Sequence, residues 1–173
     1  MRNETLNSSL HETVKSATTP RIRTNVQVMF FDTDCGGVVS NIAYLRFIEI
    51  ARTHLAEELG LAVVEMAQKE TYPVVVRTEI DYRRGAKLGD RLMIEGWLDR
   101  AERARFWCAF RIRRPQDNAL IAECRQMLAL IEMPTGKLLH LPEHWKTYEK
   151  IESGEHRDSE SRAGTVRSGE SVQ

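Results

Sequence analysis

One amphipathic helix, flanked by segments with strand periodicity, most constrains the fold of this 173-residue chain. Between residues 42 and 59, apolar side chains recur at spacings of three and four, while charged side chains occupy the opposite side. This stripe predicts a helix about 27 Å long that buries one face. Ser40 and Asn41 are suitable N-cap residues, and Gly60 is placed to end the helix. The apolar stripe consists of Tyr44, Phe47, Ile48, Ala51, Leu55 and Leu59.

Alternation of apolar and polar residues predicts strands on both sides of this helix. One strand is expected at 26–30, and four more at 76–83, 91–99, 105–112 and 120–133. The short connections between the later strands favour antiparallel pairing. The expected fold class is therefore α+β, with one long helix against an antiparallel five-stranded sheet. Because one helix covers only one face, the other face or a sheet edge is left for a partner subunit.

The two ends of the chain differ in composition from its middle. Residues 1–20 and 151–173 are polar, and the second stretch is rich in Ser, Gly, Glu and Arg. Segments with so little apolar surface to bury are expected to be disordered tails. The folded domain is therefore expected at residues 21–150.

Charge and cysteine content exclude several classes of protein. The formal net charge is zero, which gives no case for a nucleic-acid partner or a membrane surface. No segment has the roughly 20 apolar residues that would insert across a membrane, and the N-terminus lacks a signal-peptide core. Cys35, Cys108 and Cys124 are odd in number and form no CxxC motif. We therefore expect no disulfide framework, no zinc site and a cytoplasmic location.

The usual cofactor and metal motifs are missing from the sequence. It contains no G-x-S-x-G elbow, P-loop, dinucleotide fingerprint or H-E-x-x-H. His140 and His144 are four residues apart, but Pro142 between them argues against a helix that presents both. We expect neither a metal nor a cofactor.

The junction between the first strand and the helix concentrates the residues that could carry chemistry. Asp32 and Asp34 precede the adjacent Gly36 and Gly37, just before the helix begins. Amides at a helix N-terminus can stabilise a developing oxyanion while a neighbouring carboxylate acts as base or nucleophile. The alternative is that the two acids merely cap the helix, and spacing alone leaves both interpretations open.

The same stretch resembles a known family. The residues F-F-D-T-D-C-G-G-V-V-S-N-I-A-Y-L-R-F-I-E-I-A-R are similar to the opening of hotdog-fold acyl-CoA thioesterases, nearest to the 4-hydroxybenzoyl-CoA and Tol-Pal-associated group. The similarity continues through Y-P-V-V-V-R-T-E-I-D-Y-R-R-G-A-K-L-G-D-R-L-M-I-E and covers nearly the whole folded domain. It implies a sheet wrapped around the helix, an acyl-CoA substrate, hydrolysis to free acid and CoA, and a homodimer or homotetramer that binds ligand between subunits.

The resemblance also implies roles for individual residues. Asp34 matches the family's catalytic carboxylate, acting as nucleophile or as general base. The backbone N–H of Asn41 matches the donor that polarises the thioester carbonyl, while Asp32 is expected to bond loop amides. The substrate-binding residues expected from the motif are Gly36, Gly37, Val38 and Tyr44.

Asn41 departs from the family pattern, since close bacterial relatives often have histidine at this position. This departure favours an alternative function, a non-catalytic hotdog domain that binds acyl-CoA. The carboxylate of Asp34 argues against that alternative, because a pure binder gains little from a negative charge beside the thioester. A hydratase is disfavoured because it needs an Asp and His pair. Cys35 is expected to be a small packing residue, since no histidine near it in sequence would activate it.

A CoA substrate carries phosphate groups, so a basic rim is also expected. Arginine binds phosphate through its planar, bidentate fork. Arg100, Arg103 and Arg105 surround a turn that resembles the family's nucleotide-contacting turn. A second candidate cluster is Arg83, Arg84 and Lys87. Solvated surface charge is the alternative for both clusters.

Overall fold

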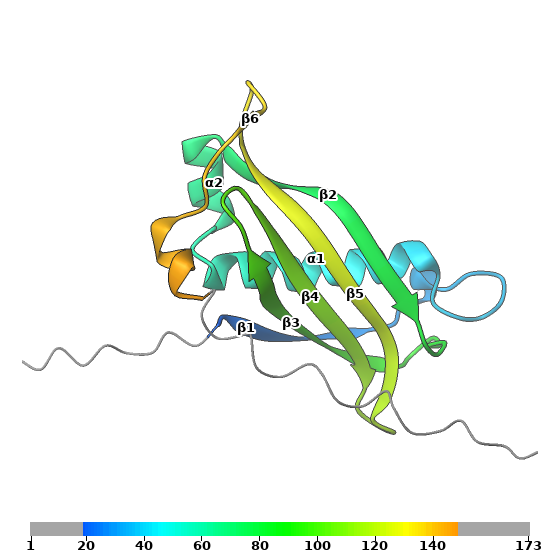
Figure 1. Ribbon diagram of the computed structural model, residues 1–173. Coiled ribbons are helices and arrows are strands. Elements are labelled where there is room, and N and C mark those ends of the chain that lie inside the picture. Colours follow the sequence, from blue (N-terminus) through cyan, green and yellow to red (C-terminus); the bar gives the residue numbers. More distant parts are fainter. Residues whose placement is uncertain (1–18, 149–173) are drawn as a thin grey trace, which may run out of the picture.

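The computed structural model describes residues 19–148, except for the side chains of residues 146 and 147 (Figure 1). Apart from residues 19 and 20, the predicted tails therefore lie outside the described residues. In chain order the elements are β1 (Arg21–Gln27), η1 (Phe30–Asp32), α1 (Asn41–Glu58), α2 (Val63–Lys69), β2 (Thr71–Tyr82), β3 (Arg91–Ala101), β4 (Arg105–Arg114), β5 (Ala119–Glu132), β6 (Lys137–Leu138) and η2 (Glu143–Thr147).

The five long strands form one antiparallel sheet that curls around α1, which confirms the expected α+β architecture (Figure 1). Their order is β1-β3-β4-β5-β2, and the two-residue strand β6 pairs with the end of β5. Strand β2 thus pairs with the much later β5 and lies at one edge of the sheet. Strand β1 lies at the opposite edge.

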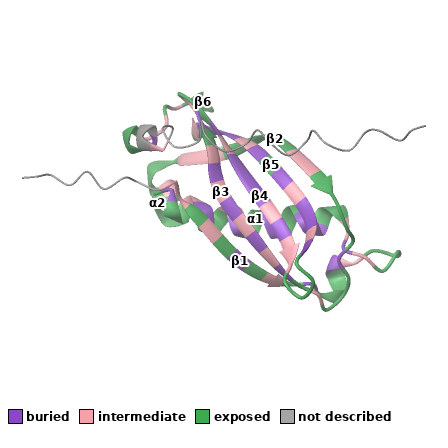
Figure 2. Ribbon diagram, turned by 60° about the horizontal axis from the view of Figure 1, so that its bottom comes forward, coloured by how far each residue is buried: buried purple, intermediate pink, exposed green. Residues whose placement is uncertain are grey.

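The core lies between α1 and the concave face of the sheet. The whole predicted stripe of α1 is buried, and so are the alternate residues of β3, β4 and β5 (Figure 2). Gly96 of β3 lies opposite Phe110 of β4, and a Cβ added at Gly96 would lie 2.9 Å from Phe110 Cδ1. The absence of a side chain at Gly96 therefore makes room for the buried Phe110 ring.

Both ends of α1 are capped by the residues around them. The Ser40 side chain accepts a hydrogen bond from the Ala43 amide, so Ser40 is the N-cap and Asn41 is the first helical residue. At the other end Gly60 has a φ of +75°, which confirms its predicted role in ending the helix. The buried Trp145 indole Nε1 then donates to the Leu59 carbonyl at 3.1 Å and closes the helix end.

Three predicted boundaries were wrong. The strand expected at 26–30 runs instead from Arg21 to Gln27. It ends there because the Asp32 carboxylate accepts a hydrogen bond from the Met29 amide and the chain bends into the turn η1. Helix α2 occupies what was expected to be a connecting segment, and none of its residues is buried. Strand β2 begins at Thr71 and passes Pro73 at the sheet edge, with an irregularity between Val75 and Arg77.

No helix among residues 19–148 is both long enough and apolar enough to cross a membrane.

Candidate functional site

The two glycines after Asp34 belong to a tight hairpin that leads into α1. Thr33 and Val39 form an antiparallel bridge, and the Asp34 amide donates to the Val38 carbonyl at 2.9 Å. The Gly37 amide then donates to the Asp34 carbonyl at 3.0 Å. Gly37 has a φ of +72°, a conformation that residues with a side chain rarely adopt. Closing this hairpin therefore requires glycine at position 37.

The Asp34 carboxylate lies at the exposed tip of the hairpin. Its Oδ1 accepts a hydrogen bond from the Gly36 amide at 2.8 Å, as in an Asx-turn. A Cβ added at Gly36 would lie 3.1 Å from the same oxygen, so glycine at 36 leaves room for this contact. Within residues 19–148 no hydrogen bond engages Asp34 Oδ2. One carboxylate oxygen is thus held by the loop, and the other faces solvent and any ligand.

The hairpin rests on the loop between β2 and β3. Val38 forms a bridge with Lys87, and the Val39 amide donates to the Ala86 carbonyl at 2.8 Å. The hydroxyl of Tyr44 accepts a hydrogen bond from the Ala86 amide at 3.3 Å. Burial raises the pKa of Tyr44, while the hydrogen bond from Ala86 opposes that rise. Tyr44, expected to bind substrate, is buried, and its hydroxyl supports the loop beside the hairpin.

The N-terminus of α1 supplies backbone amides next to this hairpin. The Ser40 side chain accepts a hydrogen bond from the Ala43 amide, and the Ser40 carbonyl accepts one from the Tyr44 amide. Within the described residues, the amides of Asn41 and Ile42 have no hydrogen-bond acceptor. Both of these residues are exposed. Such unsatisfied amides, with the positive end of the helix dipole, favour negative charge in front of the helix. The arrangement can therefore stabilise an oxyanion close to the Asp34 loop.

Asp32 bonds to a loop amide, as expected, and also forms an ion pair that sequence reasoning missed. Its side chain is 1% exposed. The Oδ2 atom accepts the Met29 amide at 2.7 Å, and Oδ1 pairs with the Arg46 guanidinium. In the sequence, Arg46 stands out only as a cation on the polar side of the helix. Its position one turn and a half after Asn41 is the signal that it can reach back to the helix entry.

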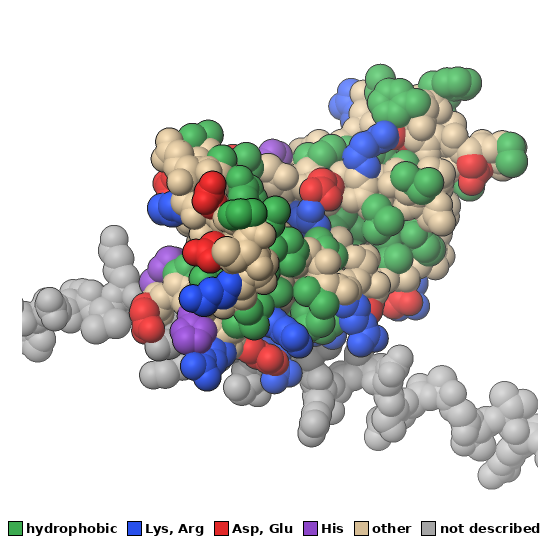
Figure 3. All heavy atoms as spheres, turned by 90° about the horizontal axis from the view of Figure 1, so that it is seen from above, with side chains coloured by type: hydrophobic (Ala, Val, Ile, Leu, Met, Phe, Trp, Pro, Cys, Tyr) green, Lys and Arg blue, Asp and Glu red, His purple; other side chains and the backbone are tan. Residues whose placement is uncertain are grey.

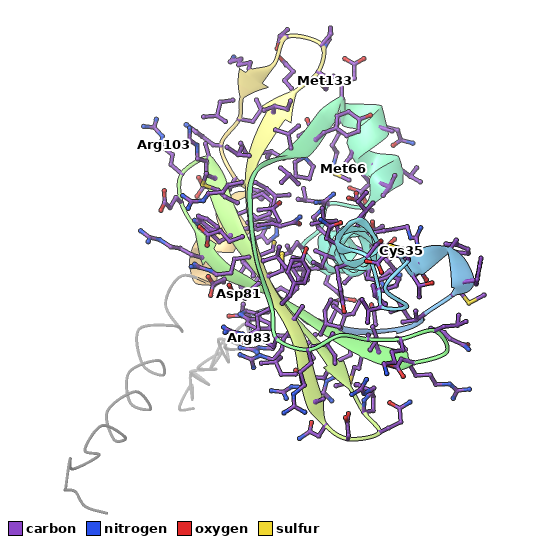
Figure 4. The ribbon with its side chains drawn as sticks, turned by 90° about the vertical axis from the view of Figure 1, so that its right-hand side faces the viewer. Cys35, Met66, Asp81, Arg83, Arg103 and Met133 are labelled. Carbon is purple, nitrogen blue, oxygen red and sulfur yellow. The ribbon has the colours of Figure 1, made fainter. Side chains whose placement is uncertain are left out.

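The turn with Arg100, Arg103 and Arg105 lies at the opposite end of the molecule from Asp34 (Figures 1 and 4). Arg105 of β4 and Val74 of β2 both lie opposite Ala129 of β5, so they are at the same level of the sheet. The hairpin, by contrast, lies near the Tyr82 end of β2. Eight residues of strand separate these levels, or roughly 26 Å. Arg103 Nε contacts His140 Nε2 at 2.9 Å, and Arg100 pairs with Glu102. A single chain does not bring these arginines to Asp34.

The second basic cluster lies closer to the hairpin. Lys87 is bridged to Val38 through the backbone, and it is exposed. Arg83, at the end of β2, contacts Asp81 and Glu123 at 3.5 and 3.4 Å. The amides of Arg83 and Arg84 both donate to the Ile121 carbonyl of β5, whereas the backbone of Lys87 pairs with the hairpin itself.

The cysteines are unpaired and differ in environment. Cys35 is exposed in the hairpin, rather than packed as expected, whereas Cys108 and Cys124 are buried. Burial raises the pKa of each buried thiol to about 12. Among the described residues, no group of three His, Cys, Asp or Glu side chains is arranged to hold a metal ion.

Comparison with known protein families identifies the family of this chain. The model of the thioesterase-like superfamily matches residues 28–148. The chain belongs to the thioesterase-like superfamily. The matched range runs from the start of the hairpin junction to the residue after η2, the turn that contains Trp145. The expected family and the hotdog fold are thereby confirmed.

Individual relatives agree with this membership. The acyl-CoA thioesterase YbgC of Haemophilus influenzae is 30% identical over 70% of this chain and 88% of that protein. The 1,4-dihydroxy-2-naphthoyl-CoA hydrolase of Synechocystis is 28% identical, with the same two coverages. Among solved structures, a 1,4-dihydroxy-2-naphthoyl-CoA thioesterase from Synechocystis superimposes with a TM-score of 0.67 at 25% identity, covering 75% of this chain and 95% of that one. A probable thioesterase from Bartonella henselae gives 0.65 at 27% identity, covering 71% and 100%.

Proposed function

We propose that this protein hydrolyses acyl-CoA thioesters to a free acid and CoA, with Asp34 as the catalytic carboxylate. The observation that carries the proposal is the exposed Asp34 side chain at the tip of a hairpin, beside the unsatisfied amides that begin α1. The similarity to an acyl-CoA thioesterase and a naphthoyl-CoA hydrolase supports the substrate class.

In this mechanism the thioester carbonyl oxygen accepts the Asn41 amide at the start of α1. The amide and the helix dipole stabilise the negative charge that develops on that oxygen when the carbonyl is attacked. Asp34 either removes a proton from the attacking water or attacks the carbonyl itself to form a mixed anhydride. Either attack first gives a tetrahedral intermediate, whose collapse breaks the C–S bond and releases CoA as the thiolate, which is protonated by solvent. Water attack yields the acid directly, whereas attack by Asp34 leaves the mixed anhydride, which a water molecule then hydrolyses to the acid and free Asp34.

The first experiment measures thiol release from a panel of short, long and aromatic acyl-CoAs. We expect hydrolysis of at least one class, and a loss of about 10²- to 10⁴-fold in kcat for Asp34→Asn. Glu65→Gln, which changes an exposed carboxylate on α2, is the matched control and should retain activity. Silence of the wild type across the panel, or equal rates for wild type and Asp34→Asn, would contradict the proposal. Tight binding of acyl-CoA without thiol release would instead support the non-catalytic alternative.

Oxygen isotopes separate the two roles of Asp34. In a single turnover in H₂¹⁸O with enzyme in excess, a general base places ¹⁸O directly in the product acid. A nucleophile leaves ¹⁸O in the Asp34 carboxylate when water attacks that carbon of the anhydride, and the acid then carries an ¹⁶O atom from Asp34. Mass spectrometry that finds ¹⁸O in the peptide containing Asp34 identifies a nucleophile. Label in the acid alone fits a general base or water attack on the acyl carbon of the anhydride, and a rapid quench that finds or fails to find the acyl group on the Asp34 peptide separates these two.

We also propose that the active unit is a homodimer, or a tetramer built from such dimers, joined through the edge strand β2. No residue of β2 is buried, and Val74, Val75 and Val76 are 37%, 41% and 51% exposed. Figure 3, which views the molecule from above Figure 1, shows several groups of hydrophobic side chains on this face, with charged side chains between them. An exposed, valine-rich edge offers unpaired backbone groups and apolar surface to another strand.

Pairing of two β2 strands would also complete the site. Antiparallel pairing across a two-fold axis places the Tyr82 end of one copy beside the Thr71 end of the other. The turn with Arg103 lies toward the Thr71 end, since Arg105 is level with Val74. The partner subunit's basic turn would therefore approach the Asp34 end of this copy, where it could bind the phosphates of CoA.

Mixed dimers test this arrangement. One variant carries Asp34→Asn, and the other has Arg100, Arg103 and Arg105 all changed to Ala. If each site combines the Asp34 of one copy with the basic turn of its partner, co-refolding the two weakly active variants restores about a quarter of wild-type activity by random pairing. If each site lies within one chain, mixing restores nothing. A monomeric mass by light scattering at micromolar concentration would contradict the assembly.

The cytoplasmic location remains part of the proposal and rests on the unpaired cysteines.

A further inference from the structure

A buried ion pair holds the base of the Asp34 hairpin. The carboxylate of Asp32 is almost fully buried, and its two oxygens face different partners, the Met29 amide and the Arg46 guanidinium. Removing one partner from such a pair leaves a buried charge without compensation, so the pair strongly restricts where Asp32 can lie.

Arg46 reaches the hairpin from the second turn of α1 and contacts more than the carboxylate. Its guanidinium carbon lies 4.8 Å from the centre of the Phe31 ring and 5.9 Å from that of Phe47. A guanidinium group can bind a carboxylate with its edge and stack on a ring with its face, whereas a lysine ammonium cannot do both. Arg46 thus fixes the turn η1 to the helix through two residues at once.

Asp32 also connects the two sides of the hairpin. Its carbonyl accepts the amide of Ser40, the N-cap of α1, at 2.8 Å. One residue later, Thr33 forms its bridge with Val39, and the next residue is Asp34. Movement of Asp34 relative to the first amides of α1 therefore requires breaking either the Asp32 contacts or the backbone pairing between Thr33 and Val39.

We propose that Asp32 and Arg46 are positioning residues that fix the Asp34 carboxylate against the N-terminus of α1. This inference rests on the proposed hydrolysis by Asp34. The apolar side chains of η1 add little to the core, since Phe30 and Phe31 are 79% and 70% exposed, so the ion pair rather than apolar packing holds η1 against the helix. A displacement of about 1 Å at a reacting group can cost roughly 100-fold in rate, so precise placement is a sufficient reason for the pair.

The test compares Arg46→Ala, Arg46→Lys and Asp32→Asn in steady-state hydrolysis of the best acyl-CoA from the panel. We expect kcat to fall by about 10- to 100-fold while KM changes by less than about threefold, with Arg46→Lys intermediate. Millimolar guanidinium should restore part of the rate of Arg46→Ala, because the side chain is half exposed and leaves an accessible space. The same addition should not restore Asp32→Asn. Lys69→Ala, which breaks the exposed pair with Glu65 on α2, is the control and should keep its kcat.

Amide hydrogen exchange gives a second measurement that does not depend on turnover. The amides of Asp34 and Gly37, which close the hairpin, should exchange faster in Arg46→Ala, while those of β4 and β5 stay unchanged.

Three outcomes would overturn the inference: unchanged kcat in the Arg46 and Asp32 variants, unchanged exchange in the hairpin, or faster exchange throughout the sheet, which would indicate a general structural role. A wild type that hydrolyses no thioester would contradict the proposed function instead. The hairpin exchange would then still show whether the pair orders the loop.

Discussion

Gly96 provides a direct test of how tightly the sheet packs over α1. In Gly96→Ala the new Cβ would lie 2.9 and 3.0 Å from two atoms of the Phe110 ring and 3.1 Å from Ile22 Cδ1. These contacts are shorter than carbon atoms tolerate, and Phe110 is only 1% exposed, so the ring has no open space to enter.

Two opposing effects set the magnitude. Overpacking of a well-filled core costs about 1 to 3 kcal/mol. Replacing glycine inside a strand recovers about 0.5 to 1 kcal/mol, because alanine loses less backbone entropy on folding. We therefore expect Gly96→Ala to lower the free energy of unfolding by about 1 kcal/mol, with an upper limit near 2.5 kcal/mol. The melting temperature should fall by about 2 to 8 °C for a domain of this size.

Urea unfolding followed by tryptophan fluorescence is the appropriate assay, at one fixed protein concentration, since self-association would shift the midpoint. Phe110→Val has no δ or ε atoms and therefore removes both ring atoms that clash. The double variant should therefore be more stable than the sum of the two single changes predicts, by about 0.5 kcal/mol or more. A Gly96→Ala protein as stable as the wild type, or strictly additive changes, would refute the packing argument.

Three further predictions follow from other contacts. Trp145→Phe keeps the aromatic packing but leaves the buried Leu59 carbonyl without its donor, so we expect a loss of about 1 to 3 kcal/mol in urea unfolding; an unchanged midpoint would contradict this. A thiol reagent at neutral pH should modify only Cys35 in the native protein, because the other two thiols are buried, and all three after denaturation; mass spectrometry counts the labels. Arg114 holds the pKa of Asp117 at about 2, below its usual 3.8, so the pair stabilises the fold above about pH 4 and loses that contribution as the pH falls toward 2. In Arg114→Gln, carboxyl NMR should find the pKa of Asp117 raised toward 3.8, and a value that stays near 2 would exclude Arg114 as the cause.

Local periodicity was enough to predict α1 and the three central strands. The stripe from Tyr44 to Leu59 follows a period of 3.6, and the apolar residues of β3 and β4 alternate, because each of these elements buries one face. Helix α2 was missed because it has no buried face and therefore no periodic pattern. It has only seven residues, none of them buried.

The hairpin was only partly predictable. The acids and glycines at residues 32–37 identified the loop, and Ser40 identified the cap. The pair between Asp32 and Arg46 depends on how the chain turns between them, which local patterns do not specify. The placement of the Arg103 turn far from Asp34 follows from strand order, a tertiary property that no local signal in the sequence reveals.

The pairing of β2 with β5 has a consequence for the synthesis of the protein. Strand β2 leaves the ribosome directly after the helices, but its one neighbour within the described chain, β5, begins only at Ala119. Until then both edges of β2, with their valine-rich surface, remain open to other chains. Contacts so distant in sequence form late and slow folding. We therefore expect a nascent chain that stalls before β5 to aggregate or to require a chaperone, and the vulnerable interval ends only when β5 docks.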